Sequence, residues 1–393
     1  MISYGKHFID EDDIEAVTDV LRGGNLTQGE VIEQFENAIA KYVDAKYAVA
    51  VSSGTAALHI ATIAAGLGKN ESLVTSPITF VASANAGLYI GSEISFVDID
   101  EKTINMSTEC LAEKLAFNSK IKLIIPVHFA GLPCNMSKIK ELADKSNAKV
   151  IEDAAHALGS TYSDGSRVGC CKNSLMTIFS FHPVKSIATG EGGMITTNDE
   201  SVYRKLLRLR SHGINKLDDS FELPDQAYKN NQRNPWYYEM QEIGFHYRIT
   251  DFQCALGLSQ LKKLEKFIER RRYLVCRYDQ AFSSMKYLRP GQATGRNQSA
   301  HHLYPLCIDF SAIKQTRGNV MRALSSKGIG TQVHYIPVPA QPFYRRLGHR
   351  PESYPNAQIY YESALTLPLF YGLSDAHQDK VIAAIKELEN GIP

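Results

Sequence analysis

Short apolar runs alternate with amphipathic segments between residues 46 and 200, and this alternation constrains the fold more than any other feature. The run "YAVAVSS" precedes "TAALHIATIAAG", "IKLIIPVHF" precedes "MSKIKELADKS", and "AKVIED" precedes "AAHALG". We expect the apolar runs to be buried strands and the amphipathic segments to be helices. Strands that alternate with helices join by right-handed crossovers, which predicts an α/β fold with a mostly parallel sheet covered on both faces. Ligand groups of such a fold collect in loops at the carboxyl ends of the strands.

The length of the chain predicts two closely packed domains, because 393 residues exceed the size at which one core usually stops growing. Residues 216–240 are polar, contain Pro and Asn, and carry the only tryptophan, Trp236. We expect a long loop there, and long loops are often functional. We divide the chain into a larger domain, residues 1–250, and a linking helix with a smaller α+β domain, residues 251–393.

The segment "LGLSQLKKLEKFIERRRYLVCRY" has the spacing of the helix that links the two domains. Its apolar stripe consists of Leu258, Leu261, Leu264 and Ile268. The opposite face is basic, which is typical of a solvated helix surface but also suits an anionic partner. The smaller domain then combines strand-like "TQVHYIP" with a closing helix, "DAHQDKVIAAIKELEN".

The charge balance argues against nucleic acid and membrane partners. The formal net charge is +1, so an anionic ligand must be held by a local site. The N-terminus, "MISYGKHFIDEDD", lacks the pattern of a secretory signal, and no apolar run approaches the roughly 18 residues of a membrane span. We therefore expect a cytoplasmic protein.

The seven cysteines predict no metal site. None are spaced as C-x-x-C, and Cys170 and Cys171 are sequence neighbours, a poor geometry for a shared tetrahedral zinc ion. We interpret the cysteines as reduced structural thiols.

A candidate anion site follows the first strand, where "VAVSSGTAALHIA" predicts a strand, a turn of small residues from Ser52 to Thr55, and a helix from about Ala56. A helix N-terminus with free amides and small side chains can bind a phosphate. The alternative is an ordinary Ser/Thr helix cap. A Walker loop is excluded, because no G-K-[ST] follows.

Two further candidates also stand at strand ends. The strand "AKVIED" ends on Asp153, whose carboxylate could hold a protonated ring nitrogen, and His156 lies one predicted helical turn later. A capping Asp and a core His are the alternatives. Lys185 follows the strand "SLMTIFSF" beside the flexible "TGEGG", where partial burial can lower its pKa enough for a Schiff base. Its alternative is a solvated surface lysine.

Together these candidates point to pyridoxal 5'-phosphate. The cofactor requires a phosphate anchor, a pyridinium partner and a covalent lysine, and the sequence supplies all three in order, each at a strand end. Each feature alone is weak evidence, whereas their combination specifies one cofactor.

A series of motifs extends this pattern over nearly the whole chain. They are "GGNLTQGEVIEQFE", "SSGTAALHIA", "SPITFVASANA", "EDAAHALGS", "SFHPVKSIATGEGGM", "RSHGI", "YRITDFQCALGLSQL" and "TQVHYIP". With these motifs the chain resembles the DegT/DnrJ/EryC1/StrS family of sugar aminotransferases. The resemblance implies the aspartate-aminotransferase type of fold (fold type I), pyridoxal phosphate as cofactor, and a homodimer whose active sites are shared between subunits.

The resemblance also implies a role for each candidate residue. Lys185 would bind the cofactor covalently, and Asp153 would pair with its pyridinium nitrogen. His156 would contact the phenolic side of the ring, and Phe80 in "SPITF" would stack on its face. The phosphate would be held by Gly54, Thr55 and Ser180.

One cofactor contact is expected from the neighbouring subunit. The family supplies an Asn to the phosphate from a "YNYR"-like motif, and here "FHYR" places His246 at that position. An imidazole can also donate to a phosphate oxygen, so we expect the contact to persist. Sugar contacts would come from Tyr4, Gly24, Asn25, Leu26, Thr27, Gln332, Val333, His334 and Tyr335. Ordinary packing is the alternative for these.

Within the family, "SFHPVK", "EMQEIGFHYRITDFQCALGLSQLKKL" and "GIGTQVHYIPV" are most similar to the pseudaminic-acid branch. Its members aminate C4 of UDP-2-acetamido-2,6-dideoxy-β-L-arabino-hexos-4-ulose with glutamate as donor. An aminotransferase for another nucleotide 4-ketosugar is the first alternative, and a non-catalytic protein that binds pyridoxal phosphate or a nucleotide sugar is the second. A sugar dehydratase of the same fold is disfavoured, because such relatives replace the lysine that Lys185 retains. A nicotinamide oxidoreductase lacks support, since no G-x-G-x-x-G follows the first strand.

Overall fold

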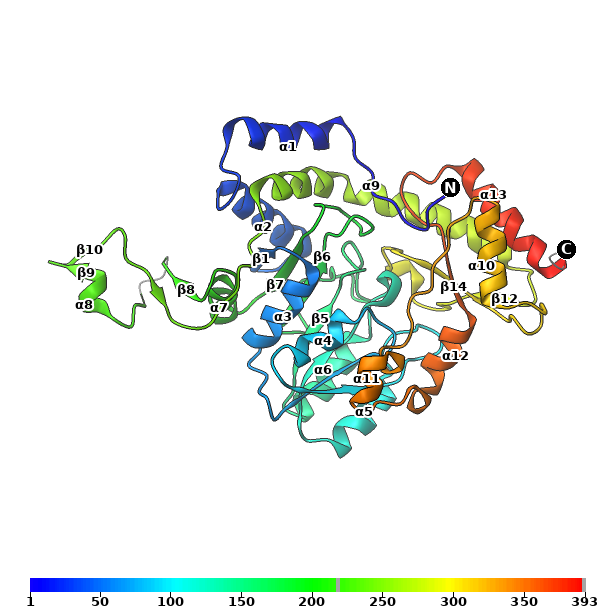
Figure 1. Ribbon diagram of the computed structural model, residues 1–393, viewed down its shortest axis with the longest axis horizontal. Coiled ribbons are helices and arrows are strands. Elements are labelled where there is room, and N and C mark those ends of the chain that lie inside the picture. The colour runs from blue at the N-terminus through cyan, green and yellow to red at the C-terminus, as the bar shows by residue number, and fades with distance from the viewer. Residues whose placement is uncertain (217–219, 391–393) are drawn as a thin grey trace.

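A computed structural model of the chain describes residues 1–216 and 220–390, and its centre is a seven-stranded sheet (Figure 1). The strands are β1 (Tyr47–Val51), β2 (Ser72–Thr75), β3 (Glu93–Phe96), β4 (Ile121–Ile125), β5 (Lys149–Asp153), β6 (Met176–Ser180) and β7 (Gly193–Thr197). Their order is β1-β7-β6-β5-β4-β2-β3, and β7 alone runs antiparallel to its neighbours. The predicted α/β fold with a mostly parallel sheet is confirmed.

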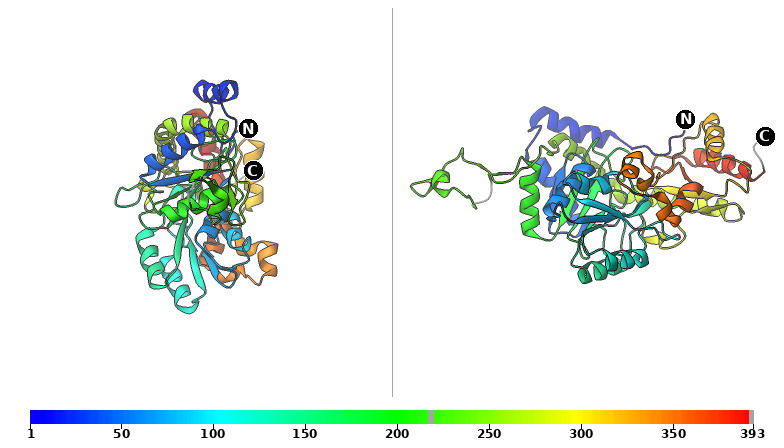
Figure 2. Two further views of the ribbon diagram at one scale, coloured as in Figure 1. Left: turned by 90° about the vertical axis from the view of Figure 1, so that its left-hand side faces the viewer. Right: turned by 60° about the horizontal axis from the view of Figure 1, so that its bottom comes forward.

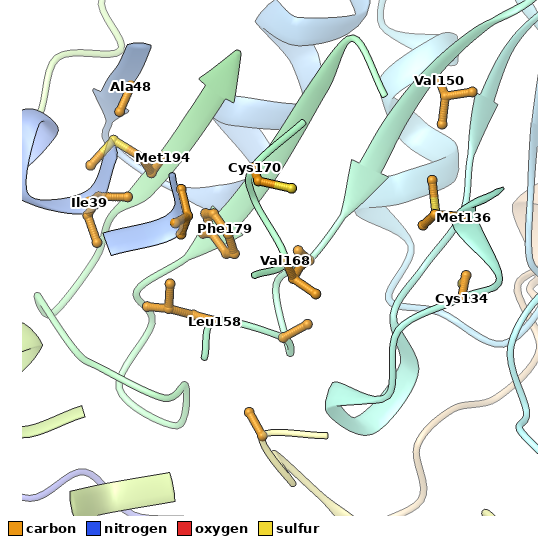
Figure 3. Packing of buried hydrophobic residues seen from close by; sticks show 14 of the residues in the cluster. Ile39, Ala48, Cys134, Met136, Val150, Leu158, Val168, Cys170, Phe179 and Met194 are labelled. Carbon is orange, nitrogen blue, oxygen red and sulfur yellow. The ribbon is translucent and has the colours of Figure 1, made fainter. Parts of the chain in front are cut away.

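Helices cover both faces of this sheet, because successive side chains of a strand point to opposite sides. In β1, Ala48 packs into one core cluster and Val49 into the other. Figure 3 shows the first cluster, in which Phe179, Met194 and Ile39 fill the space between the sheet and α2. This cluster is covered by α2 (Glu30–Val43), α5 (Thr108–Phe117), α6 (Met136–Lys145) and α9 (Asp251–Phe282), and the second by α3 (Gly54–Ala64), α4 (Ala82–Leu88) and α7 (Glu200–Arg210).

The long helix α9 connects the large sheet to a smaller one (Figure 1). Leu264 and Ile268 pack against the large sheet, and Leu274 and Tyr278 pack into the core of the small sheet. The predicted apolar stripe of this helix is therefore present. The small sheet is antiparallel, with the order β12-β13-β14. The remaining main elements are α1 (Glu11–Gly23), β12 (Leu288–Pro290), β13 (Tyr304–Ile308), α10 (Arg317–Ser326), α11 (Pro342–Arg346), α12 (Pro355–Ser363), β14 (Ala364–Leu367) and α13 (Asp375–Lys386).

The division into residues 1–250 and 251–393 stays a prediction, and residues 391–393 lie outside the described residues. The first residues of the chain contact the C-terminal half, since Ile2 bridges to Ile329 and is buried in the core of the small sheet. No helix within the described ranges is long and apolar enough to cross a membrane.

Residues 220–243 project from one end of the molecule, as Figures 1 and 2 show. They contain only short elements, namely α8 (Pro224–Ala227), β9 (Tyr228–Lys229), β10 (Gln232–Arg233) and β11 (Glu239–Met240), the last of which pairs with β8 (Ile214–Asn215). Trp236 lies here and is 73% exposed. The predicted long loop is thus a projecting arm, and its residues 217–219 lie outside the described residues.

Two predicted elements are wrong. The segment "AAHALG" after β5 forms turns instead of a helix. The N–H of Ala154 continues the pairing with β6 through the carbonyl of Ile178, and Asp153 Oδ1 accepts the N–H of Ala155. Gly159 then has a φ of +91°, which ends the segment close to α9. The N–H groups of Ala157 and Ser160 then bond the carbonyls three residues earlier, so the backbone closes in tight turns instead of an α-helix.

The segment "TQVHYIP" also lacks a regular strand. Only Gln332 pairs with the small sheet, by a bridge to Thr366 of β14. The side chain of His334 then bonds Thr366 Oγ1, and Pro337 has no N–H to extend a ladder. The segment leaves the sheet and passes along the cavity described below.

Gly257 in α9 offers a test of how tightly the helix packs. A Cβ at this position would lie 2.6 Å from Cζ of Phe35, whose ring is fully buried. We expect Gly257→Ala to lower the free energy of unfolding by about 1–3 kcal/mol, because overpacking outweighs the better helix propensity of alanine. Gly23→Ala is the matched control, since nothing lies within 4 Å of its Cβ. Thermal denaturation measures both variants, and equal stability would show that Phe35 can move aside.

Candidate active site

A cavity of about 610 Å³ lies where the carboxyl ends of β5 and β6 meet the N-terminus of α3. It is lined by every residue predicted for the cofactor from within one subunit: Gly54, Thr55, Phe80, Asp153, His156, Ser180 and Lys185. Of the predicted sugar contacts, Tyr4 and residues 332–335 also line it. Segments that are far apart in the sequence therefore converge on one cavity.

The start of α3 forms one wall of the cavity. Ser53 caps the helix, and its Oγ accepts the N–H of Ala56 at 3.0 Å. Gly54 is in contact with β6, because a Cβ added to it would lie 2.9 Å from the Cβ of Ser180. The helix therefore begins at Gly54, slightly earlier than predicted. Its positive end and the Ser180 hydroxyl face the same space, which suits a phosphate group.

Asp153 is 5% exposed and is held in place by two donors. Its Oδ1 accepts the N–H of Ala155 at 3.1 Å, and its Oδ2 accepts the hydroxyl of Ser83 at 2.6 Å. Because Ser83 gives its only proton to the carboxylate, Thr79 must donate to Ser83 Oγ across their 2.7 Å contact. The carboxylate retains free lone pairs and can accept a further donor from the cavity.

Lys185 is half-buried in the loop after β6, where its N–H donates to the carbonyl of His182. Burial lowers the pKa of its amine to about 8, while the nearby Asp153 opposes this change. A lysine with this pKa holds a substantial neutral fraction near neutral pH, as a nucleophile or base requires. Lys185 lies on the wall of the cavity, and its covalent role stays a prediction.

His156 is buried and both of its ring nitrogens have partners. Nδ1 accepts the N–H of Ala130 at 3.3 Å, so Nε2 carries the proton and faces Tyr335 Oη at 3.2 Å. Burial and the charge of Lys185 hold the pKa of His156 well below its ordinary value. The imidazole is therefore neutral, and its single N–H, on Nε2, donates to the hydroxyl oxygen of Tyr335 at the cavity.

Two aromatic residues flank the cavity from different segments. Phe80 is 59% exposed, and its ring centroid lies 6.4 Å from that of Tyr335. The ring of Tyr4 lies 5.4 Å from that of His334, which is itself buried. These contacts bring the N-terminal segment and residues 332–335 to the same side of the site.

Five predicted residues do not line the cavity of their own chain. Residues 24–27 lie in the exposed turn between α1 and α2, where Thr27 bridges to Thr250. His246 is also exposed, and its ring lies 5.4 Å from that of His212. His246 was expected to act from a neighbouring subunit, so its role and those of residues 24–27 stay predictions.

Three further residues, which no sequence motif indicated, support the site from behind. Ser83 and Thr79 orient Asp153, and His302 lines the cavity beside His156. Ser83 lies in α4 and Thr79 in the turn before it, so the contact between their hydroxyls depends on the shape of that turn. His302 also lacks a local sequence signal, because it reaches the cavity only through tertiary packing.

Residues 7–386 match the DegT/DnrJ/EryC1/StrS aminotransferase family. The chain belongs to this family. It is 38% identical to the spore coat polysaccharide biosynthesis protein SpsC of Bacillus subtilis, over 99% of this chain and 97% of that protein. It is 36% identical to the UDP-4-amino-4,6-dideoxy-N-acetyl-beta-L-altrosamine transaminase of Campylobacter jejuni, over 100% of this chain and 99% of that protein.

Solved structures of sugar aminotransferases have the same fold. Helicobacter pylori PseC, an aminotransferase involved in the biosynthesis of pseudoaminic acid, superposes with a TM-score of 0.87 at 29% identity, over 99% of each chain. The putative sugar aminotransferase Spr1654 of Streptococcus pneumoniae superposes in its PLP-form with a TM-score of 0.87 at 28% identity, over 99% of this chain and 98% of that one. The fold, the family and the aminotransferase class predicted from the sequence are confirmed.

The family is pyridoxal-phosphate-dependent, and the residues of this cavity fit that cofactor. The close approach of Gly54 to Ser180 leaves backbone N–H groups and a hydroxyl for the phosphate. The carboxylate of Asp153 accepts two hydrogen bonds and retains a lone pair that can accept a third from a protonated ring nitrogen. Lys185 supplies an amine whose pKa is already lowered.

The lowered pKa of Lys185 can be tested in cofactor-free protein. We expect its reaction with acetic anhydride to rise with pH around a midpoint of about 8, since only the neutral amine reacts. Asp153→Asn removes the charge that raises this pKa, so the midpoint should move to lower pH. Mass spectrometry of the labelled peptides gives both profiles, with exposed lysines as internal references. A midpoint of about 10 for Lys185 would contradict the effect of burial.

The hydroxyl of Ser83 gives a second test. We expect Ser83→Ala to weaken cofactor retention about tenfold, because it removes a hydrogen bond to a charged group worth about 1.5 kcal/mol or more. Thr79→Val is the graded comparison, since it removes the more distant hydroxyl and should have a smaller effect. Absorbance titration of the cofactor-free proteins measures the affinity. Equal retention by wild type and Ser83→Ala would show that Asp153 needs no support from Ser83.

Proposed function

We propose that this protein moves the amino group of glutamate to C4 of UDP-2-acetamido-2,6-dideoxy-β-L-arabino-hexos-4-ulose. The observation that carries the proposal is the meeting of Lys185, Asp153 and the α3 N-terminus in one cavity that also reaches Tyr4 and residues 332–335. The sugar is supported by the names of the Campylobacter jejuni and Helicobacter pylori relatives. A protein that only bound pyridoxal phosphate or a nucleotide sugar would not need an amine with a lowered pKa in this cavity, as Lys185 has.

The bound cofactor supplies a pyridinium ring that accepts the negative charge developing at the donor Cα and a carbon that carries the amino group between substrates. Asp153 keeps the ring nitrogen protonated, and the hydroxyl of Ser83 keeps the carboxylate in position. Gly54, Thr55 and Ser180 hold the phosphate.

Lys185 performs the proton transfers. Its neutral Nζ takes the proton from the donor Cα as a general base. The protonated amine then gives this proton up again as a general acid. The same steps in reverse deliver the amine to the ketosugar. His156 would offer the ring the neutral N–H that it shares with Tyr335, and Phe80 would stack on the ring.

A second candidate substrate is another nucleotide 4-ketosugar. It stays a candidate because the Bacillus subtilis relative, at 38% identity, is named for spore coat polysaccharide biosynthesis and for no particular sugar. The residues that hold the cofactor would be the same in both cases. The choice between the two sugars therefore depends on residues that face the substrate.

We also propose that the enzyme is a homodimer with shared active sites and acts in the cytoplasm. The position of His246 supports the shared site, because it is exposed and lies outside the cavity of its own chain. In a dimer it would reach the partner's phosphate. Residues 24–27, which are exposed in one chain, would likewise contact the sugar in the partner's active site.

A panel of UDP- and dTDP-linked 4-ketosugars tests the proposed function. Incubation of the holoenzyme with glutamate and the UDP-linked arabino-hexos-4-ulose should yield 2-oxoglutarate and a UDP-aminosugar, identified by mass spectrometry and NMR. Lys185→Ala should lower this activity at least about 100-fold, because it removes the general base. Borohydride should attach the cofactor to Lys185 in the wild type and to no residue in the variant. An amine product from a different ketosugar alone would establish the second candidate, and none from any ketosugar would exclude transamination.

A further inference from the structure

His302 lies on the wall of the cavity, and none of the roles above uses it. It is 4% exposed, stands just before β13, and its ring centroid lies 4.4 Å from that of His156. Within the described part of the chain, its Nδ1 is sealed from solvent and has no hydrogen-bond partner. Burying an unpaired polar atom costs about 1–3 kcal/mol. A ligand cannot reach this sealed atom, so the proton belongs on Nε2, which is not sealed, has no partner among the described residues and can meet a ligand in the cavity.

The backbone holds His302 in place from two distant segments. Its carbonyl accepts Nη1 of Arg271 in α9 at 3.1 Å, and its N–H donates to the carbonyl of Ala130 at 2.9 Å. Ala130 and His301 both adopt left-handed conformations, with φ of 55° and 50°. Such conformations cost about 1–3 kcal/mol each and persist only where the surroundings impose them. The chain therefore fixes the position of the His302 ring at an energetic cost.

The surroundings of His302 favour an anion. Burial holds its pKa well below the ordinary value, so its ring is neutral and offers one N–H. After burial, the groups that lower this pKa are His156, Lys185, Arg271 and His334, and of these Lys185 is a cation that faces the same cavity. An anion placed here would meet a hydrogen-bond donor and the amine of Lys185, in a cavity that the carboxylates of Asp153 and Glu191 also line.

We propose that His302 donates a hydrogen bond to the α-carboxylate of the amino-acid donor. This inference rests on the proposed function, because it requires that the amine comes from an amino acid. The α-carboxylate is bonded to the Cα whose proton passes to Lys185 Nζ, so it must lie near that amine. Arginine is the usual bidentate partner of carboxylates, but among the described residues no arginine lines the cavity.

A neutral donor also suits a site that receives two substrates in turn. An arginine would leave an unpaired buried charge when the uncharged ring of the ketosugar replaces the amino acid, and such a charge is costly. A neutral histidine leaves only one N–H to be paired by a sugar oxygen. The same N–H of His302 can therefore donate to a carboxylate of the amino acid or to a hydroxyl of the sugar.

Two ligands, one with and one without an α-carboxylate, test the proposal on the holoenzyme. α-Methylglutamate keeps the carboxylate but has no Cα proton to lose, and 4-aminobutyrate is glutamate without the α-carboxylate. Absorbance titration gives a dissociation constant for each, independently of turnover. We expect His302→Phe to weaken α-methylglutamate about tenfold and 4-aminobutyrate less than twofold. His302→Gln keeps an N–H and should recover most of the affinity for α-methylglutamate.

The outcomes separate this inference from the proposed function. Equal effects of His302→Phe on both ligands, or no effect on either, would overturn the role of His302 while leaving the transaminase intact. A wild-type protein that binds α-methylglutamate but aminates no ketosugar would overturn the proposed function alone. The visible absorbance of the lysine-bound cofactor confirms that each variant is folded and loaded.

Discussion

The active site depends on two buried acids at the end of β5, which point to opposite faces of the sheet. Glu152 is fully buried and accepts hydrogen bonds from His128 Nε2 at 2.8 Å, Tyr162 Oη at 2.5 Å, and also Ser174 and Thr177. Burial alone would raise the pKa of Glu152, but these donors hold it below the ordinary value. Because side chains alternate along a strand, anchoring Glu152 on one face directs Asp153 into the cavity on the other.

The pairing of β5 with β6 carries this geometry to the rest of the site. Asp153 stands opposite Ile178, so Ser180 and the loop with Lys185 emerge beside it. The N-terminus of α3 approaches the same edge, because Gly54 lets its backbone contact Ser180. Three groups with different chemistry meet because parallel strands end at one edge of a sheet, and this explains how short separate motifs specify one cofactor.

The parts of the site that could be predicted are those encoded by local patterns. The strand, turn and helix around Gly54 follow from residue types within one short segment, and Lys185 follows from its place after a strand. The helix expected at His156 was wrong, because the chain stays paired with β6 at Ala154 and then closes in tight turns in which Ala157 and Ser160 bond carbonyls three residues earlier. The strand expected at residues 331–337 was wrong for a similar reason, since His334 bonds a side chain of β14 instead of extending its ladder. A helix or strand that local residue types favour does not form where contacts with distant segments fix the backbone in another conformation.

This difference separates cofactor binding from substrate recognition. The residues proposed to hold the cofactor belong to motifs at strand ends that the sheet brings together, whereas His302 owes its position to Arg271 in α9 and to Ala130 in a different loop. Tyr4 and residues 332–335 likewise reach the cavity from the two ends of the chain and meet only through packing. Substitutions that alter this packing can change the part of the cavity formed by Tyr4 and residues 332–335 while Lys185 and Asp153 keep their positions. A family built in this way can retain one chemistry and exchange its sugars, which is why the sequence specifies the cofactor more sharply than the substrate.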